Sequence, residues 1–231
     1  MCGIVGFYNI GDLSGALPRA LAALAHRGPD ASGNGGYSCG LFAQLVEGDS
    51  EVTLRTPPPL DTPLRADGLD VYAPAGNTLV AEVRPTTIEL ELPSPPTHVE
   101  AGEPDLAHPF PNCFVCGPAR TDGLRLMPRR YGSVVAAPWR PAEVSRELVW
   151  AALDCPGAFA VNPDFSRGAC VLGRLAVHVE ELPEAGDDLV VVGWDLGGAA
   201  GRRSHAGTAL FRGKTPLAWG RATWFAVPSG A

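Results

Sequence analysis

Long apolar runs, basic residues and secretory features are all scarce in this sequence. No apolar stretch approaches the roughly 20 residues that a membrane-spanning helix needs. Lys and Arg number 18 against 25 Asp and Glu, and the resulting net charge of −7 disfavours nucleic acid, which is bound through basic side chains that neutralise phosphates. The first residues lack the basic and apolar regions of a signal peptide. We therefore expect a cytoplasmic protein with no membrane span and no nucleic-acid partner.

Closely spaced cysteines are also scarce. Among six cysteines, only Cys113 and Cys116 form a C-x-x-C pair. Such a pair is half of a zinc site or a redox dithiol in other proteins. His108 lies upstream, but a fourth ligand is not evident. We interpret the pair as thiols packed in a tight turn, with a metal or redox role as the alternative, and expect no metal and no cofactor.

Composition divides the 231 residues into three stretches. Residues 1–33 form an N-terminal segment. Residues 34–118 form a first unit that ends in a proline-rich connector (93–118), and residues 119–231 form a second unit. The hydrophobic share of 45% is enough for a substantial core in a chain of this length.

Both units place a helix pattern before strand patterns. In the first, a helix is predicted over 37–45, and alternating or β-rich runs follow at 51–55, 69–72, 78–84 and 88–92.

In the second unit a single helix is predicted over 143–160, and strand patterns fill 169–227. Val171, Leu175 and Val177 are expected on one face of the first of these strands. A helix followed by an antiparallel meander lets a sheet wrap around a buried helix, which predicts an α+β fold.

These segments resemble a double hotdog protein of the acyl-CoA thioesterase superfamily, over about residues 33–228. The resemblance is carried by NGGYSCGLFAQL (34–45), HPFPNCFVCG (108–117), VWAALDCPGAFA (149–160), LGRLAVHVE (172–180), VVVGW (190–194), HAGTALF (205–211) and LAWGRATW (217–224). It implies two fused hotdog units whose antiparallel sheets join edge to edge around two central helices. The superfamily's ligands imply an acyl-CoA or acyl-carrier thioester as the partner. Whether the protein forms a homo-oligomer stays open.

The N-terminal segment resembles a different family, the class II glutamine amidotransferases. MCGIVG (1–6) and HRGPD (26–30) carry this likeness, which implies Cys2 as an alternative nucleophile and Arg27 in a glutamine pocket. The family's Asn-Gly-Glu segment has no counterpart, because residues 34–36 lack the glutamate. The segment is therefore interpreted as an amidotransferase-like fragment, or as a leading strand and helix of the first unit.

The hotdog resemblance implies that a carboxylate and a backbone N–H act on the thioester. Asp154, late in an apolar helix, is the candidate carboxylate, with capping of a local turn as its alternative role. Asn34, Gly35 and Gly36 are the candidate donors to the carbonyl. The two glycines could instead only permit close helix packing. The first helix carries no acid of its own, so one site is expected rather than two.

Further site residues follow from the last strands. The resemblance implies that Thr208 presents a hydroxyl near the carboxylate, and His205 is a candidate for substrate binding or a structural histidine. The glutamine that related enzymes carry on the last strand is absent, and Thr223 is its candidate substitute.

Arg202 and Arg203 flank a glycine-rich turn. They are candidate ligands for the phosphates of coenzyme A or a pantetheine arm. The alternative is that they only form the solvated tip of a hairpin. Three functions are therefore carried forward: hydrolysis of acyl thioesters, acyl binding without catalysis, and a truncated amidotransferase.

Overall fold

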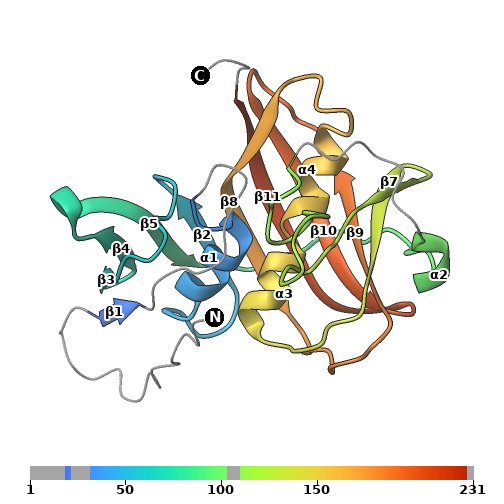
Figure 1. The fold of residues 1–231 in the computed structure, drawn as a ribbon, viewed down its shortest axis with the longest axis horizontal. Coiled ribbons are helices and arrows are strands. Elements are labelled where there is room, and N and C mark those ends of the chain that lie inside the picture. The colour runs from blue at the N-terminus through green and yellow to red at the C-terminus, as the bar shows by residue number, and fades with distance from the viewer. Residues whose placement is uncertain (1–18, 22–31, 103–109, 228–231) are drawn as a thin grey trace.

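The computed structural model describes residues 19–21, 32–102 and 110–227, and only the backbone of 19–21. Its strands are β1 (Arg19–Leu21), β2 (Ser50–Leu54), β3 (Leu64–Asp67), β4 (Asp70–Ala73), β5 (Thr78–Pro85), β6 (Arg129–Tyr131), β7 (Val134–Trp139), β8 (Ala169–Val179), β9 (Leu189–Asp195), β10 (Arg203–Arg212) and β11 (Thr215–Val227). Its helices are α1 (Gly35–Ala43), α2 (His98–Ala101), α3 (Arg146–Ala152) and α4 (Cys155–Val161), with a 3-10 turn η1 (Ala75–Asn77) (Figure 1). No helix in this described part of the chain is both long and apolar enough to cross a membrane.

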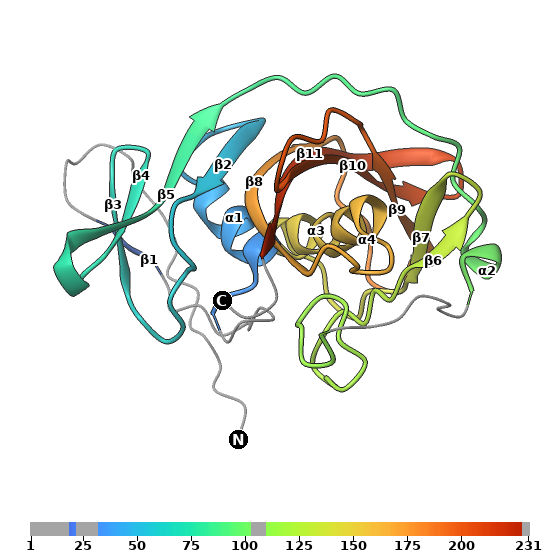
Figure 2. The same ribbon diagram turned by 90° about the horizontal axis from the view of Figure 1, so that it is seen from above.

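The eleven described strands form one antiparallel sheet, in the order β1-β3-β4-β5-β2-β8-β11-β10-β9-β7-β6. Strands β8, β11, β10 and β9 arch over α3 and α4, and β2 and β5 lie over α1 (Figure 2). The main hydrophobic core fills the space between the inner face of the sheet and these helices. The predicted α+β class with a large antiparallel sheet is confirmed.

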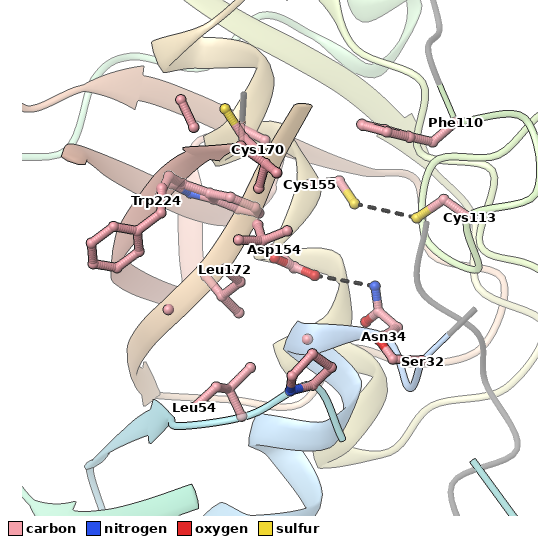
Figure 3. Close-up of a pocket in the computed structure, with 18 of the residues that line it drawn as sticks. Ser32, Asn34, Leu54, Phe110, Cys113, Asp154, Cys155, Cys170, Leu172 and Trp224 are labelled. Carbon is pink, nitrogen blue, oxygen red and sulfur yellow. Dashed lines mark hydrogen bonds between the residues drawn. The ribbon is translucent and has the colours of Figure 1, made fainter. Parts of the chain in front are cut away.

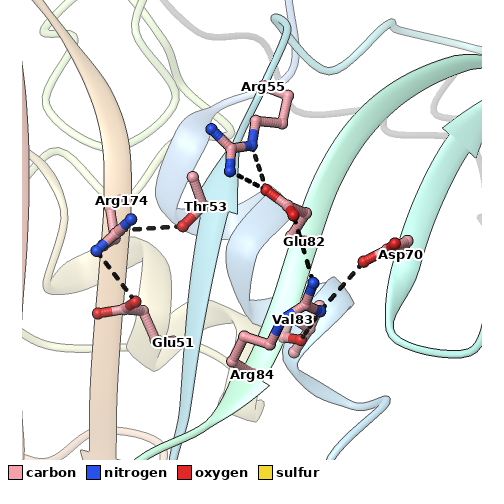
Figure 4. Close-up of polar contacts among 8 residues, drawn as sticks. All are labelled: Glu51, Thr53, Arg55, Asp70, Glu82, Val83, Arg84 and Arg174. Atoms are coloured by element: carbon pink, nitrogen blue, oxygen red, sulfur yellow. Dashed lines mark hydrogen bonds and ion pairs between the residues drawn. The ribbon is translucent and has the colours of Figure 1, made fainter.

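The sheet is continuous because β2, from the first half of the chain, pairs with β8 from the second. Side chains on this seam add polar contacts: the Arg174 guanidinium donates to the Thr53 hydroxyl at 3.0 Å and pairs with Glu51 at 3.3 Å (Figure 4). A neighbouring pair, Arg84 and Asp70, links β5 to β4. Because such surface pairs contribute only about 0–1 kcal/mol each, the ladder hydrogen bonds and the core hold the seam.

Helix α1 packs against α3 through two glycines one turn apart. The helix begins after Asn34, whose side-chain oxygen accepts the Tyr37 N–H at 2.9 Å. A Cβ on Gly40 would lie 2.8 Å from the Glu147 Cα, and a Cβ on Gly36 would meet the α3–α4 junction. Because glycine has no side chain at these two positions, the helices can approach each other closely.

The second predicted helix is broken into two. Pro156 has no N–H and its ring clashes with the carbonyl four residues earlier, so α3 cannot continue through it. The chain bends at Leu153 and Asp154, and α4 starts at Cys155. This break aims the Asp154 side chain across the interface toward α1.

A β-bulge at Gly173 changes which residues of β8 face the core. Thr223 pairs with Arg174, but the next residue of β11 pairs with Leu172, so Gly173 is the extra residue. Leu172 therefore joins Leu175 on the inner face, and the prediction that Val171 shares that face is wrong. The phenyl ring of Phe225 occupies the space that a side chain on residue 173 would need.

Residues 88–92, predicted to be a strand, lie outside the sheet. Strand β5 is already paired with β4 and β2, so the residues that follow it find no free edge beside it. They cross the outer face of the sheet toward α2 instead (Figure 2). Ile88 is buried there, and its carbonyl accepts the Trp219 indole N–H at 3.2 Å.

His178 on β8 makes the stability of the sheet at this seam depend on pH. Its Nδ1 lies 2.9 Å from an Asp49 carboxylate oxygen, and its Nε2 lies 3.0 Å from Glu180. Burial lowers the pKa of His178, but hydrogen bonds and charge from Glu180 and Asp49 outweigh that effect and raise it above 6.5. The stabilisation is therefore fully present below pH 6.5 and is lost as the pH rises through the raised pKa.

We expect the free energy of unfolding of the wild type to fall between about pH 6 and pH 8.5 by more than that of His178→Gln. Glutamine keeps polar contacts but does not titrate. Urea denaturation at both pH values measures the difference. Equal pH dependence in the two proteins would contradict this assignment.

Candidate active site

The break between α3 and α4 places the Asp154 carboxylate against the first turn of α1. One carboxylate oxygen, Oδ2, accepts the Asn34 side-chain amide at 3.1 Å (Figure 3). The same oxygen accepts the Gly36 backbone N–H at 2.9 Å. Asp154 is 2% exposed. A buried acid from the second half of the chain thus meets donors from the first half.

Asn34 and Gly36 are both fixed by their surroundings. Asn34 uses its side-chain oxygen to cap α1, which leaves its amide nitrogen to face Asp154. A Cβ on Gly36 would lie 2.4 Å from the Asp154 Cβ, so only glycine fits. Its N–H also belongs to the positive end of the α1 dipole.

The surroundings of Asp154 allow its carboxyl to take up and release a proton near neutral pH. Burial raises the pKa of its carboxyl to about 7; the Gly36 N–H and the Asn34 amide oppose this rise, and negative charge on Cys113 adds to it. The second oxygen, Oδ1, is buried and has no hydrogen-bond partner among the described residues. The carboxyl can therefore accept a proton at Oδ1 without breaking an existing contact.

Asp154 lines a cavity of about 340 Å³. Most of the surrounding side chains are apolar, including Phe159. Phe110, Leu172 and Trp224 lie around the carboxylate in Figure 3. This size and lining are typical of small-molecule sites, in which a few polar groups orient a largely apolar ligand. Gly35 also lies on the wall.

The Thr208 hydroxyl was expected near the Asp154 carboxylate, but its hydrogen bond goes to Leu153, the residue before Asp154. Thr208 is fully buried on the inner face of β10, and its hydroxyl donates to the Leu153 carbonyl at 2.8 Å. It thereby supports the helix break that presents Asp154. A direct role in chemistry stays a prediction.

His205 and Thr223 are on the other side of the sheet. Side chains alternate along a strand, so the inward position of Thr208 sends His205 outward. The Thr223 hydroxyl and His205 Nδ1 are 3.3 Å apart, in a second cavity of about 230 Å³ that also includes Arg203. His205 and Thr223 therefore lie in a different cavity from Asp154, and their roles in substrate binding stay predictions. Arg202, by contrast, lines the Asp154 cavity, so the arginine pair is split between the two faces.

Three cysteines meet in the wall of the Asp154 cavity. The Sγ atoms of Cys113, Cys116 and Cys155 lie within 4.8 Å of one another. Hydrogen bonds from the thiols of Cys116 and Cys155 lower the pKa of Cys113, whereas the pKa values of those two thiols are raised. The sequence interpretation left out Cys155, although it follows the candidate carboxylate directly.

The amidotransferase-like residues Cys2 and Arg27 lie outside the described residues, as does His108. The roles implied for Cys2 and Arg27 stay predictions.

No family model and no curated protein matches this sequence. Solved structures do match the fold. The tesB protein of Mycobacterium avium subsp. paratuberculosis is similar with a TM-score of 0.58 and 14% identity, over 94% of this chain and 95% of that one. A hot dog fold protein from Alicyclobacillus acidocaldarius gives 0.59 at 10% identity, over 85% and 88%.

The acyl-CoA thioesterase II TesB2 of Mycobacterium marinum is similar with a TM-score of 0.51 and 14% identity, over 87% of this chain and 92% of that one. At these identities the likenesses show the fold, which is the hotdog fold.

Proposed function

We propose that this protein hydrolyses acyl thioesters of coenzyme A or of an acyl carrier. The observation that carries the proposal is the buried Asp154 carboxylate, which has one oxygen without a partner among the described residues and lies against the N-terminus of α1 in an apolar cavity. The likeness of the fold to the tesB protein and to TesB2 supports the same chemistry.

In the proposed reaction, Asp154 acts as a general base. Its free oxygen takes a proton from a water molecule while the water oxygen adds to the thioester carbonyl carbon. The Gly36 N–H, assisted by the Asn34 amide, donates to the carbonyl oxygen as negative charge develops there. The carbon–sulfur bond then breaks, and the proton passes from Asp154 to the leaving thiolate. The products are a carboxylic acid and a free thiol.

The substrate must displace one set of contacts to reach this geometry. Gly36 and Asn34 now donate to Asp154 itself, and the thioester oxygen would take over these donors. Leu172, Phe159 and Trp224 offer apolar surface for the acyl chain. Arg202, exposed on the cavity wall, is the residue proposed to meet the phosphates of the carrier.

We also propose that the chain is a fusion of two hotdog units, residues 34–118 with the connector and residues 119–231. The donors at Asn34 and Gly36 then come from one unit and the acid from the other. This arrangement supports one composite site per chain, as the acid-free first helix predicts.

A thiol-release assay over acyl-CoA substrates from acetyl to palmitoyl tests the function. We expect turnover, with a preference for the chain lengths that fill the cavity. Release of no thiol from any acyl-CoA or acyl-carrier substrate would contradict hydrolysis.

Acyl binding without catalysis is the second candidate. It is favoured by the hydrogen bonds that already occupy Gly36, Asn34 and the Thr208 hydroxyl, and by the missing glutamine. Saturable binding of an acyl-CoA, measured by calorimetry without turnover, would support it over hydrolysis.

A further inference from the structure

The three cysteines in the cavity wall have the geometry of a metal site. Cys113 Sγ and Cys155 Sγ are 3.7 Å apart, and all three Sγ atoms lie within 4.8 Å of one another. In a tetrahedral zinc site, with zinc–sulfur bonds of about 2.3 Å, neighbouring sulfurs are about 3.8 Å apart. Small side-chain rotations would bring all three sulfurs to that spacing.

The C-x-x-C turn is shaped to present thiolates. The backbone N–H groups of Val115 and Cys116 help to lower the pKa of the Cys113 thiol, and the Gly117 N–H closes the turn on the Cys113 carbonyl at 2.8 Å. Residue 117 must be glycine, because a Cβ there would lie 2.4 Å from that carbonyl oxygen. Donors aimed at a sulfur favour its deprotonated form, which is the form that binds metals.

The segment around this turn is held by buried side chains such as Phe114, Val115 and Leu126, not by helix or strand. Residues 110–128 contain neither helix nor strand, and their internal order comes from backbone hydrogen bonds such as Leu124 N–H to Phe114 and Leu126 N–H to Val115. Cys155 begins α4, 42 residues beyond Cys113. A shared ion would therefore fasten the loop to the helix that follows Asp154.

We propose that Cys113, Cys116 and Cys155 bind one zinc ion through three thiolates. Each thiol loses its proton as its bond to the metal forms. Because the three cysteines line the cavity, the fourth tetrahedral position opens toward it and takes a water molecule. The proposal is independent of thioester hydrolysis.

Three convergent thiols favour a metal over a disulfide. A disulfide joins two sulfurs, and any pairing here would leave the third thiol buried beside it. A soft divalent ion uses all three, and thiolate ligands select zinc over hard cations such as magnesium or calcium. Oxidation of two of these cysteines is therefore treated as an outcome of the test.

Metal analysis of the untagged full-length protein, purified without chelator, tests the site. We expect about one zinc per chain by mass spectrometry of the metal content, and a large loss of zinc in Cys113→Ser, Cys116→Ser and Cys155→Ser. Cys170→Ser is the matched control, because Cys170 is buried and lines the same cavity outside the cluster. It should retain its zinc.

A second measurement, on the wild type, tests the proposal even if the cysteine variants fail to fold. Cobalt added to zinc-depleted wild type should give the intense thiolate-to-cobalt charge-transfer bands of a tetrahedral sulfur-rich site, and zinc should abolish them. Chelation should lower the melting temperature, and zinc should restore it. A metal-free protein that gives no cobalt spectrum, iron in place of zinc, or a disulfide within the cluster would each overturn the proposal.

Discussion

Asp154→Asn is expected to lower kcat for acyl-CoA hydrolysis by about 100- to 10,000-fold, the usual contribution of a general base. Asparagine keeps an oxygen that can accept the Gly36 N–H, so the contact between α1 and the helix break survives. It cannot take a proton from water. The free energy of unfolding should therefore change by no more than about 1 kcal/mol. Thiol release and urea denaturation measure the two quantities.

Asp67→Asn provides the matched control. Asp67 lies on β3, is largely exposed, pairs with Arg65 and is not among the residues that line the Asp154 cavity. The same chemical change there should leave thiol release unchanged. If Asp154→Asn retained wild-type turnover, the general-base role would be excluded, even though the protein would still be a thioesterase.

Gly40→Ala is expected to lower the free energy of unfolding by about 2–3 kcal/mol, as overpacking in a tight core does. The new Cβ would lie 2.8 Å from the Glu147 Cα and 2.8 Å from the Trp150 Cβ. Neither atom can move unless α1 and α3 separate. In an ordinary helix the same substitution stabilises by about 1 kcal/mol, so the sign of the change is itself diagnostic.

Gly35→Ala, in the same helix, is the control for this prediction. The three atoms nearest to its Cβ would all belong to the Leu172 side chain, the closest at 3.0 Å, and a shift of a few tenths of an ångström there would relieve the contact. We expect a change below about 1 kcal/mol. Chemical denaturation of both variants provides the comparison. A stabilising Gly40→Ala would show that the helices do not approach as closely as described.

Much of the fold could be predicted because its elements carry local signals. The helix near residue 37 and the strands at 51–55, 69–72 and 78–84 were predicted close to the observed bounds, since alternation and helical spacing are properties of neighbouring residues. The bulge at Gly173 and the outer path of residues 88–92 depend on which strands already occupy the sheet edges. Short-range pattern does not contain that information.

The candidate site shows the same division. Asp154 could be selected because an acid is unusual in so apolar a segment. Its contact with Gly36 spans 118 positions of sequence, and proximity became evident only with the fold. His205 was a candidate for substrate binding because the face of β10 on which it lies was not yet known. Counting alternate residues from Thr208 would have placed it outside.

The crossing of residues 86–97 over the outer face has a consequence for how the chain is made. Its partners there come from strands synthesised later: Trp219, which donates to the Ile88 carbonyl, follows it by 131 residues. A chain that has not yet reached β11 therefore lacks the Trp219 donor that the Ile88 carbonyl accepts. Strand β11 therefore has two roles, since it joins β8 to β10 within the sheet and holds the segment that crosses the outer face.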